Sequence, residues 1–372
     1  MSVQIYPSLD SLPERVAGFI GEAERRSFFY GVPWYRTFYA TACPDGDEPR
    51  IYVAERQGRV VAALIARERW RAGTFRTHML ISVSHVMYTS DYGPILDPEE
   101  GLAGLSEIVA AIATASPAFD VLRFDSMDPK SPGFETMVAG FQSHGFLVQP
   151  FKNFGNWYEN VEGQTSDIYL ANRSSKTRYH IRHRTRVLAR DERGRYELVT
   201  GGPKLEQALA DYERVAAQSW KDEEPWPDCV PAIVRMAAKT GALRLGVYYV
   251  DNEPAAAQIW IVHGGEVTIF RGCYAEKFGR FAVATALTWQ IIRHMLDVDK
   301  PREIDFGRGD DEYKRTWLPR RREKWGMLVF NPYTAKGLAI AAKNLIGHRV
   351  MMTLRQIGRF LRVLPRQDHA LD

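Results

Sequence analysis

The densest group of side chains that could transfer protons lies between residues 305 and 317, which read DFGRGDDEYKRTW. The segment follows a short apolar stretch that we predict to be a strand, and its two glycines permit a tight turn. Like charges at the spacing of its four carboxylates raise their pKa values, and the neighbouring lysine and arginines lower them. Perturbed pKa values are common at functional sites. We therefore interpret the segment as part of an active site, with a solvated acidic turn as the alternative.

A second group follows a predicted strand over residues 266–274. The loop after this strand carries basic and small residues, AEKFGRFAVA over 275–284, and enters a predicted helix. Free backbone N–H groups and the helix dipole at such a helix start can hold a diphosphate. An ordinary turn between a strand and a helix is the other interpretation of this loop.

The elements that must position these groups are those of a mixed α/β fold, predicted from helical and alternating hydrophobic periodicity. In the first half of the chain we expect helices over 10–25, 32–42, 100–115 and 132–144 and strands over 50–56, 59–70 and 120–125. In the second half we expect helices over 178–191, 203–221 and 281–297 and strands over 243–250, 254–263, 266–274 and 303–306.

The two halves look like copies of one unit. The turn at Gln57-Gly58 and the small-residue strand after it align with Asp251-Asn252 and the strand that follows. Further on, residues 122–124 align with residues 304–306. We interpret this as a duplication, although two unrelated α/β domains could give the same pattern. At 372 residues the chain is long enough for two domains, which we place at 1–165 and 166–332, with a tail over 333–372.

Composition excludes several classes of protein. Hydrophobic residues make up 45% and charged residues 25% of the chain, which are ordinary values for globular domains and not for a disordered chain. The longest apolar run, 60–66, is far shorter than a membrane-spanning helix, and the first residues do not resemble a secretion signal. Three widely spaced cysteines give no disulfide framework or zinc cluster and fit a reducing cytoplasm.

The order of these parts is similar to that of a known family. A hairpin with small residues, a strand that ends in a tyrosine, a basic loop entering a helix and the pattern DFGxGDxxYKxxW together resemble the GNAT-superfamily acyltransferases of the Fem-like, CelD/BcsL-type branch. The resemblance runs from about Ser27 to Pro332, and the segment 169–190 also looks like the basic helix that opens the family's second domain. It implies an α/β chain of two tandem GNAT-like domains with mixed sheets, the second of them catalytic.

What the resemblance implies about chemistry is N-acyl transfer with acyl-CoA as co-substrate and no permanently bound cofactor. A backbone N–H of the strand before the loop would polarise the thioester carbonyl. Tyr313 would protonate the leaving thiolate, and a carboxylate would take the proton of the acceptor ammonium. The carboxylates considered are Asp305, Asp310 and Glu312. The donor diphosphate would be held by Lys277, Gly279, Arg280, Phe281, Ala282, Val283 and Ala284. Where relatives often have Ser-Pro-Gly at the helix start, this chain has Phe281-Ala282-Val283.

The acceptor side is predicted from two other stretches. Residues 174–186 are strongly basic, and Arg178, Arg182 and Arg186 form one helical stripe that could bind an acceptor or be a solvated face. Trp220, in an aromatic and acidic loop, and Lys314 complete the predicted acceptor contacts, while core packing is the alternative for Trp220. His180 and His183 lack companion ligands at metal spacing, so we expect no metal.

The C-terminal tail predicts a membrane contact. Residues 313–372 contain thirteen Lys/Arg and three Asp/Glu, a net charge of +10, and the other 312 residues carry −6. Over 349–366 an apolar stripe faces an arginine stripe, which is typical of a helix that lies on an anionic membrane. A helix docked on the protein or on a second chain is the alternative, and nucleic acid is not expected as a partner because no nucleic-acid-binding fold accompanies the charge.

We therefore predict an acyl-CoA-dependent N-acyltransferase that acts on an amine of an envelope precursor, in the cytoplasm or on the inner face of its membrane. The first choice is a lipid amine resembling a sphingoid base, as in bacterial ceramide synthesis. The alternatives are an amino sugar of a capsule or exopolysaccharide, aminoacyl transfer to a peptidoglycan precursor as in Fem-like relatives, and a non-catalytic module that keeps the fold.

Overall fold

The structure is a computed structural model that describes residues 1–71, 76–85, 88–190 and 193–344. Thirteen strands of the described chain form one mixed sheet in the order β1-β2-β3-β4-β6-β13-β7-β12-β11-β10-β9-β8, with β5 paired to β3. The strands are β1 (Ser2–Tyr6), β2 (Asp47–Arg56), β3 (Arg59–Arg71), β4 (Thr77–Ser82), β5 (Ile95–Leu96), β6 (Val121–Met127), β7 (Leu147–Asn160), β8 (Gly194–Val199), β9 (Leu243–Val250), β10 (Glu253–His263), β11 (Glu266–Tyr274), β12 (Glu303–Asp305) and β13 (Arg320–Phe330).

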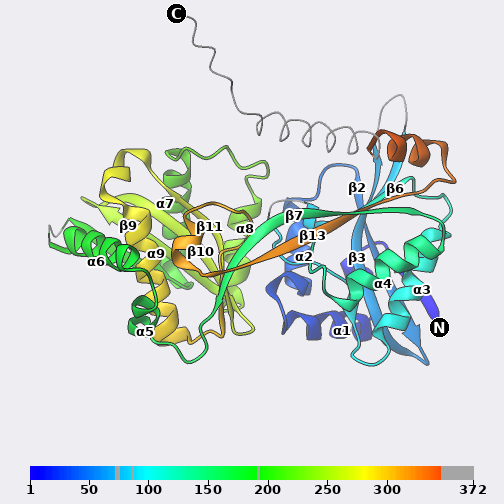
Figure 1. Cartoon of the computed structure of the whole chain (residues 1–372), viewed down its shortest axis with the longest axis horizontal. Helices are drawn as coiled ribbons and strands as arrows, with labels where there is room; N and C mark the ends of the chain where they lie inside the picture. The colour runs from blue at the N-terminus through cyan, green and yellow to red at the C-terminus, as the bar shows by residue number, and fades with distance from the viewer. Residues whose placement is uncertain (72–75, 86–87, 191–192, 345–372) are drawn as a thin grey trace, which may run out of the picture.

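Helices cover both faces of this sheet, and the mixed α/β class is confirmed. They are α1 (Glu14–Glu24), α2 (Val32–Thr41), α3 (Gly101–Ala113), α4 (Pro132–Ser143), α5 (Ser166–Ala171), α6 (Ser175–Arg190), α7 (Leu205–Ala217), α8 (Cys229–Lys239), α9 (Val283–His294) and α10 (Lys314–Trp317). Figure 1 shows two lobes: the first contains β1–β6 and α1–α4, and the second contains β8–β12 and α5–α10.

The long strands β7 and β13 join the two lobes (Figure 1). They pair along their whole length, from Arg320 opposite Tyr158 to Phe330 opposite Leu147. One end of β13 also pairs with β6 of the first lobe, while the opposite end of β7 pairs with β12 of the second lobe. The last strand of the described residues, β13, therefore completes the sheet of the first lobe, and the domain division at residues 165 and 332 stays a proposal.

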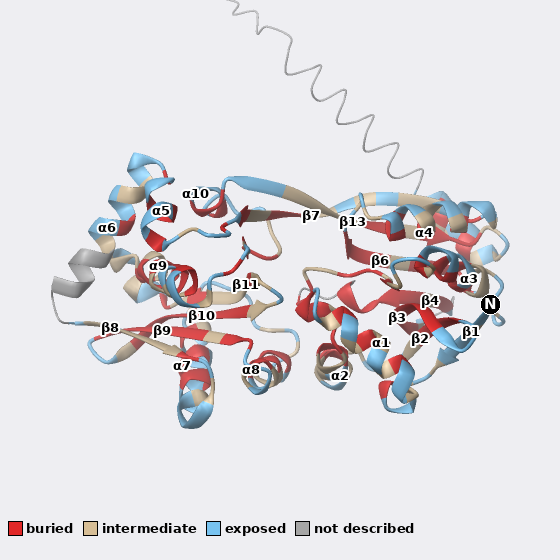
Figure 2. Cartoon of the chain, turned by 90° about the horizontal axis from the view of Figure 1, so that it is seen from below, coloured by how far each residue is buried: buried red, intermediate tan, exposed pale blue. Residues whose placement is uncertain are grey.

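Each lobe buries its strands between helices. In the second lobe α7 and α8 lie on one face of the sheet and α5, α6 and α9 on the other (Figure 2). Burial does not alternate along the hairpin strands: β3 and β10 are almost continuously buried, as is usual for central strands covered on both faces. One apolar cluster continues from the first lobe to α7 and α8, and a second contains α9 and the inner side of α5.

The two lobes share one feature that matters for function. Each contains a single short parallel ladder of three residue pairs, β4 with β6 in the first lobe and β11 with β12 in the second. The matching ladders support the duplication predicted from the sequence. In the second lobe a large cavity opens beyond the end of this ladder.

Candidate active site

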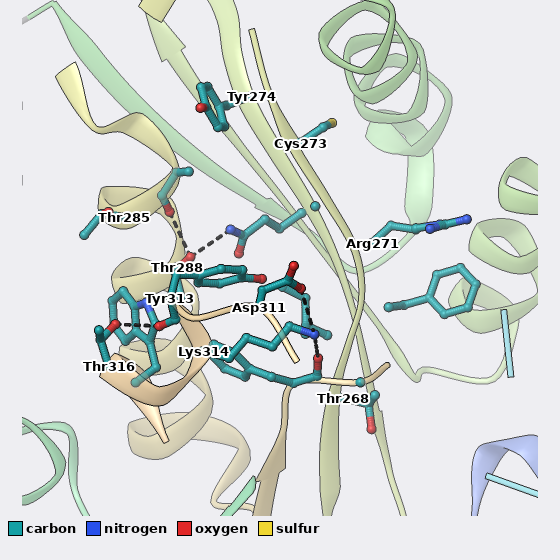
Figure 3. Close-up of a pocket in the computed structure, with 18 of the residues that line it drawn as sticks. Thr268, Arg271, Cys273, Tyr274, Thr285, Thr288, Asp311, Tyr313, Lys314 and Thr316 are labelled. Atoms are coloured by element: carbon teal, nitrogen blue, oxygen red, sulfur yellow. Dashed lines mark hydrogen bonds and ion pairs between the residues drawn. The ribbon is translucent and has the colours of Figure 1, made fainter. Parts of the chain in front are cut away.

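A cavity of about 820 Å³ opens where β11 and β12 part. Their pairing ends at Thr268 opposite Asp305, where β12 stops, whereas β11 continues to Tyr274. Beyond Thr268 that edge of β11 has no strand partner in the described part of the chain. Figure 3 shows Thr268, Arg271, Cys273 and Tyr274 along this strand, with α9 and the segment around Tyr313 opposite them.

The free part of β11 is irregular at its midpoint. Ile259 of β10 pairs with Arg271, but the next residue, Trp260, pairs with Ile269, so Phe270 is an extra residue on β11. Such a bulge takes backbone groups out of the regular ladder and bends the strand. Because Phe270 lines the cavity, this irregular part of β11 borders the same space.

The start of α9 forms another wall. The helix begins after Ala282, which has φ +54°, and no side chain caps its first turn. The backbone N–H groups of that turn are therefore left for a ligand or solvent. Of the seven residues predicted to hold a donor diphosphate, Ala284 lines the cavity. Thr285 and Thr288, further along α9, line it as well. Lys277 instead lies in the short helix over Glu276–Phe281 and forms an ion pair with Glu253.

The segment after β12 is held by buried polar contacts. Asp305 Oδ1 accepts hydrogen bonds from Asn156 Nδ2 at 2.6 Å and from the backbone N–H of Gly307, whose φ is +61°. The buried Lys314 ammonium donates to the carbonyl oxygens of Phe306 at 2.9 Å, Arg308 at 2.5 Å and Gly309 at 3.3 Å. These contacts fold residues 305–314 into a compact turn that ends in α10. They favour a loop-positioning role for Lys314, whose predicted contact with the acceptor stays a proposal.

Tyr313 lines the cavity at the end of this turn. Thr288 and Asp311 line the same cavity and are drawn with Tyr313 in Figure 3. Tyr313 is 51% exposed, so the neighbouring protein desolvates the phenol only in part. This desolvation and the negative charge of Asp311 raise the pKa of Tyr313 to about 12. The phenol is therefore protonated at neutral pH and can donate a proton or a hydrogen bond into the cavity.

The three predicted base carboxylates do not line the main cavity with Tyr313. Asp305 has its oxygens engaged as described, and Arg322 binds its Oδ2. Asp310 accepts from Trp157 Nε1 and from Arg321, which lowers the pKa of Asp310. Glu312 is exposed. The carboxylate that does line the cavity is Asp311, 3.6 Å from Lys314 Nζ, and sequence reasoning did not single it out from its neighbours.

The predicted acceptor residues are divided between the cavity and the outside. Trp220 lines the cavity. Arg178 donates to the carbonyls of Ala171 and Arg173, and neither Arg178 nor Arg182 is a lining residue. The residues of α6 that line the cavity are Lys176, Thr177, His180 and Ile181. Helix α6 is where the sequence predicted a basic helix, but it turns a different stripe toward the cavity.

The first lobe closes the cavity on its far side. Phe29, Tyr88 and Ser90 are lining residues. Tyr88 Oη donates to Glu224 Oε2 at 2.6 Å, and Arg271 Nη2 donates to the same oxygen at 2.8 Å. The Arg271 guanidinium also lies 4.8 Å from the centroid of the Tyr88 ring. The loop that follows α7 is thereby tied both to β11 and to the first lobe.

A smaller cavity of about 110 Å³ shares Phe29, Ser90 and Thr268 with the main one. It is polar, and Glu266, Asp305, Arg322 and Lys324 are among its lining residues. Burial, with Glu303, Asp305 and Asp91 nearby, raises the pKa of Glu266 to about 7, and Arg322 opposes this shift. Glu266 thus changes charge within the physiological pH range.

Within the described residues no group of three or more His, Cys, Asp or Glu side chains is arranged to hold a metal ion. No helix of that part of the chain is long and apolar enough to cross a membrane. The predicted amphipathic tail over 349–366 lies outside the described residues.

Comparisons with known proteins agree with this arrangement. Residues 175–315, which contain most of the second-lobe residues that line the cavity, match the family model for the acetyltransferase (GNAT) domain. No curated protein sequence matches the chain.

Three solved structures share the fold over nearly the whole chain. The crystal structure of FemX has a TM-score of 0.61 at 11% identity and covers 88% of this chain and 97% of its own. The C-terminal domain of a protein assigned as lysylphosphatidylglycerol synthetase from Agrobacterium fabrum has a TM-score of 0.52 at 15% identity and covers 88% and 95%. A tandem GNAT protein from the clavulanic acid biosynthesis pathway has a TM-score of 0.50 at 12% identity and covers 88% and 98%.

Proposed function

We propose that the protein transfers an acyl group from acyl-CoA to the amine of an envelope precursor. The premise is that residues 175–315 form a GNAT acyltransferase domain in a chain with the Fem-like tandem GNAT fold. The observation that carries the proposal is the cavity between β11, α9 and the turn that ends in Tyr313. It offers a helix start without a side-chain cap, a strand bulge and a protonated phenol along one continuous space.

In this proposal the donor diphosphate binds at the first turn of α9, near Ala284, where free N–H groups and the helix dipole favour negative charge. The pantetheine arm follows the unpaired edge of β11. The thioester then lies at the Phe270 bulge, where a backbone N–H stabilises the negative charge that develops on the carbonyl oxygen.

The reaction balances without a further co-reactant. The acceptor ammonium loses one proton, and its nitrogen attacks the thioester carbon. The nitrogen loses a second proton as the amide bond forms, and this proton restores the Tyr313 phenol once that phenol has protonated the thiolate. The C–S bond breaks, and Tyr313 Oη donates its proton to the departing thiolate. Asp311 is the carboxylate in the cavity that can take up the ammonium proton, and Asp305, Asp310 and Glu312 remain the earlier candidates for that role.

Our first choice of acceptor is a long-chain amine resembling a sphingoid base. The sequence of the tail supports it, because a basic amphipathic segment over 349–366 would bring the protein to an anionic membrane surface where such an amine resides. One fold relative is assigned as a lysylphosphatidylglycerol synthetase, and this name is consistent with a lipid acceptor. An amino sugar and Fem-like aminoacyl transfer are the alternative acceptor chemistries.

The deciding experiment measures thiol release from a panel of acyl-CoA donors with long-chain amines, amino sugars and short soluble amines. Release that depends on both substrates supports the proposal, and the most efficient amine identifies the acceptor class. If calorimetry detects no acyl-CoA binding at high micromolar concentration, the CoA form of the proposal is wrong and a non-catalytic module becomes the better explanation.

A further inference from the structure

The first lobe contains a counterpart of the cavity opening. In the first lobe the parallel ladder runs from Met79 opposite Val121 to Ile81 opposite Arg123. In the second lobe it runs from Glu266 opposite Glu303 to Thr268 opposite Asp305. In this register Ser82 and Ser84 correspond to Ile269 and Arg271, and Asp125 corresponds to Gly307.

Serine hydroxyls bridge β4 and β6 at the place in the first lobe that corresponds to the cavity opening in the second. The backbone N–H of Asp125 donates to Ser82 Oγ at 3.1 Å, and Ser84 Oγ donates to the Asp125 carbonyl at 2.7 Å. The two hydroxyl oxygens lie 2.8 Å apart. Beyond the ladder, the two strands are therefore bridged by side chains in the first lobe, whereas the large cavity opens at the corresponding place in the second.

A side chain from the second lobe completes this closure. Arg308 Nη1 donates to the carbonyl oxygen of Thr89 at 2.9 Å, to Ser126 Oγ at 3.0 Å and to the carbonyl oxygen of Ser84 at 3.3 Å. The guanidinium carbon lies 4.3 Å from the centroid of the Phe154 ring of β7. Burial lowers the pKa of Arg308 to about 10, with Asp125 opposing the shift, so the group is still charged at neutral pH.

The backbone of the same residue belongs to the active-site turn. Arg308 stands between Gly307 and Gly309, whose φ values are +61° and +104°, so the flanking backbone supplies little rigidity of its own. The Arg308 carbonyl accepts a hydrogen bond from Lys314 Nζ, and Lys314 directly follows Tyr313. The contacts of one residue thus connect the first lobe to the phenol.

We propose that Arg308 is a positioning residue: its guanidinium occupies the first lobe's counterpart of the donor opening and holds the turn that places Tyr313. The inference rests on the proposed function of Tyr313 as proton donor. In this proposal the first lobe binds no donor. It binds the Arg308 side chain instead, and so orders the turn of the second lobe that contains Tyr313.

A double-mutant cycle with Arg308→Met and Tyr313→Phe tests this. Misplacing a catalytic group by about 1 Å can cost on the order of 10²-fold in rate, so we expect Arg308→Met to lower kcat by about 10- to 100-fold with donor Kd nearly unchanged. If Arg308 acts through Tyr313, the double variant is no slower than Tyr313→Phe alone, because the phenol that was being positioned is already absent. Losses that multiply in the double variant overturn the proposal.

Two further variants keep the test decisive. Ser126→Gly removes one acceptor of the guanidinium at a position with φ +63°, where glycine is favourable, so it is expected to fold and to lower kcat in the same direction. Arg235→Met removes an exposed arginine paired with Glu206 and is expected to leave kcat unchanged. If Arg308→Met does not fold, the same cycle with Ser126→Gly decides, and full activity in Ser126→Gly overturns the proposal.

Binding stoichiometry supplies an independent readout. Calorimetry with acyl-CoA should give one donor bound per chain. Two donors per chain would overturn the inference that the first lobe binds the Arg308 side chain in place of a donor. Full activity in Tyr313→Phe would overturn the proposed function of Tyr313. A slow Tyr313→Phe variant together with a fully active Arg308→Met variant would instead overturn only the positioning role of Arg308.

Discussion

Asn156 Nδ2 lies 2.6 Å from Asp305 Oδ1 and so ties β7, which crosses between the lobes, to the turn that carries the active-site residues. The same carboxylate accepts from the Gly307 N–H and from Arg322. A buried carboxylate whose oxygens are all engaged is well placed to hold a turn. It is poorly placed to take a proton from an acceptor.

We therefore predict that Asp305→Asn lowers the melting temperature, because it removes the charge opposite Arg322 and turns an amide donor toward existing donors. Loss of hydrogen bonds at a buried charged group costs about 1–3 kcal/mol. Glu312→Gln, on an exposed side chain, should leave the melting temperature unchanged. Thermal unfolding of both variants checks this, and an Asp305→Asn protein with normal stability but no turnover would return Asp305 to the list of catalytic bases.

The sequence predicted the hairpins and central helices well, since each has a strong local pattern. The strands β7 and β13 were missed because their signal is not local. Pro150, Gly155 and half-exposed side chains interrupt alternation in β7, and its stability comes from pairing with a strand more than 160 residues away. The exchange of strands between lobes therefore could not be inferred from periodicity.

At the site, the sequence predicted the turn that ends in Tyr313, but it did not predict which carboxylates of that turn line the cavity and which form ion pairs outside it. Asp310 pairs with Arg321 while Asp311 lines the cavity, and adjacent carboxylates in a turn carry no pattern that distinguishes them. In the sequence of α6, the stripe of arginines is a stronger pattern than the stripe that lines the cavity. The stripe that lines the cavity contains Lys176 and His180, four residues apart, and only the packing of α6 on α9 selects it.

Tyr313→Phe should lower kcat strongly and leave donor affinity nearly unchanged, because the lost proton acts when the thiolate departs. A single general-acid contact contributes on the order of 10²- to 10⁴-fold. Steady-state thiol release together with calorimetric donor binding measures the two effects separately. Tyr179→Phe, at an exposed tyrosine of α6, is the matched control and should behave as the unaltered protein.

Ala282→Gly should stabilise the protein slightly and leave donor affinity intact or improved. Ala282 has φ +54°, a backbone conformation that costs a residue with a side chain about 1–2 kcal/mol. Part of this gain is offset by the greater freedom of glycine in the unfolded chain, about 0.4–1 kcal/mol. Denaturant unfolding checks the sign, and Ala286→Gly, inside α9, should destabilise instead. A large loss of stability in Ala282→Gly would contradict the strain argument.

Removing every residue after Gly347 should abolish co-sedimentation with anionic vesicles if residues 349–366 act as an interfacial helix. Each basic residue near such a surface contributes roughly 1 kcal/mol, so binding of the intact chain should weaken with salt without vanishing, since its apolar part is unscreened. Activity on a long-chain amine should fall more than activity on a short soluble amine. If the intact chain does not bind vesicles, the amino-sugar acceptor becomes the better choice.

Glu266→Gln should stabilise the protein at pH 8 and have little effect at pH 4. Burial and the carboxylates of Glu303, Asp305 and Asp91 raise the pKa of Glu266 to about 7 from an ordinary value of 4.5, with Arg322 acting in the opposite direction. The folded protein thus holds the Glu266 proton more tightly than the unfolded chain does. The resulting contribution to stability is fully present below pH 4.5 and is lost as the pH rises through 7.

The glutamine variant lacks this titration, so the difference between its melting temperature and that of the unaltered protein should grow between pH 4.5 and 7 and then level off. Glu206→Gln supplies a control of opposite sign, because the hydrogen bond from Arg235 lowers the pKa of Glu206, and its replacement should not stabilise the protein at high pH. Melting temperatures of the three proteins from pH 4 to 8 decide the matter. A Glu266→Gln difference that is flat with pH would mean that Glu266 has the same pKa in the folded and the unfolded chain. The Glu266 carboxylate in the polar cavity beside Thr268 would then ionise near its ordinary pKa of 4.5 and stay charged at neutral pH.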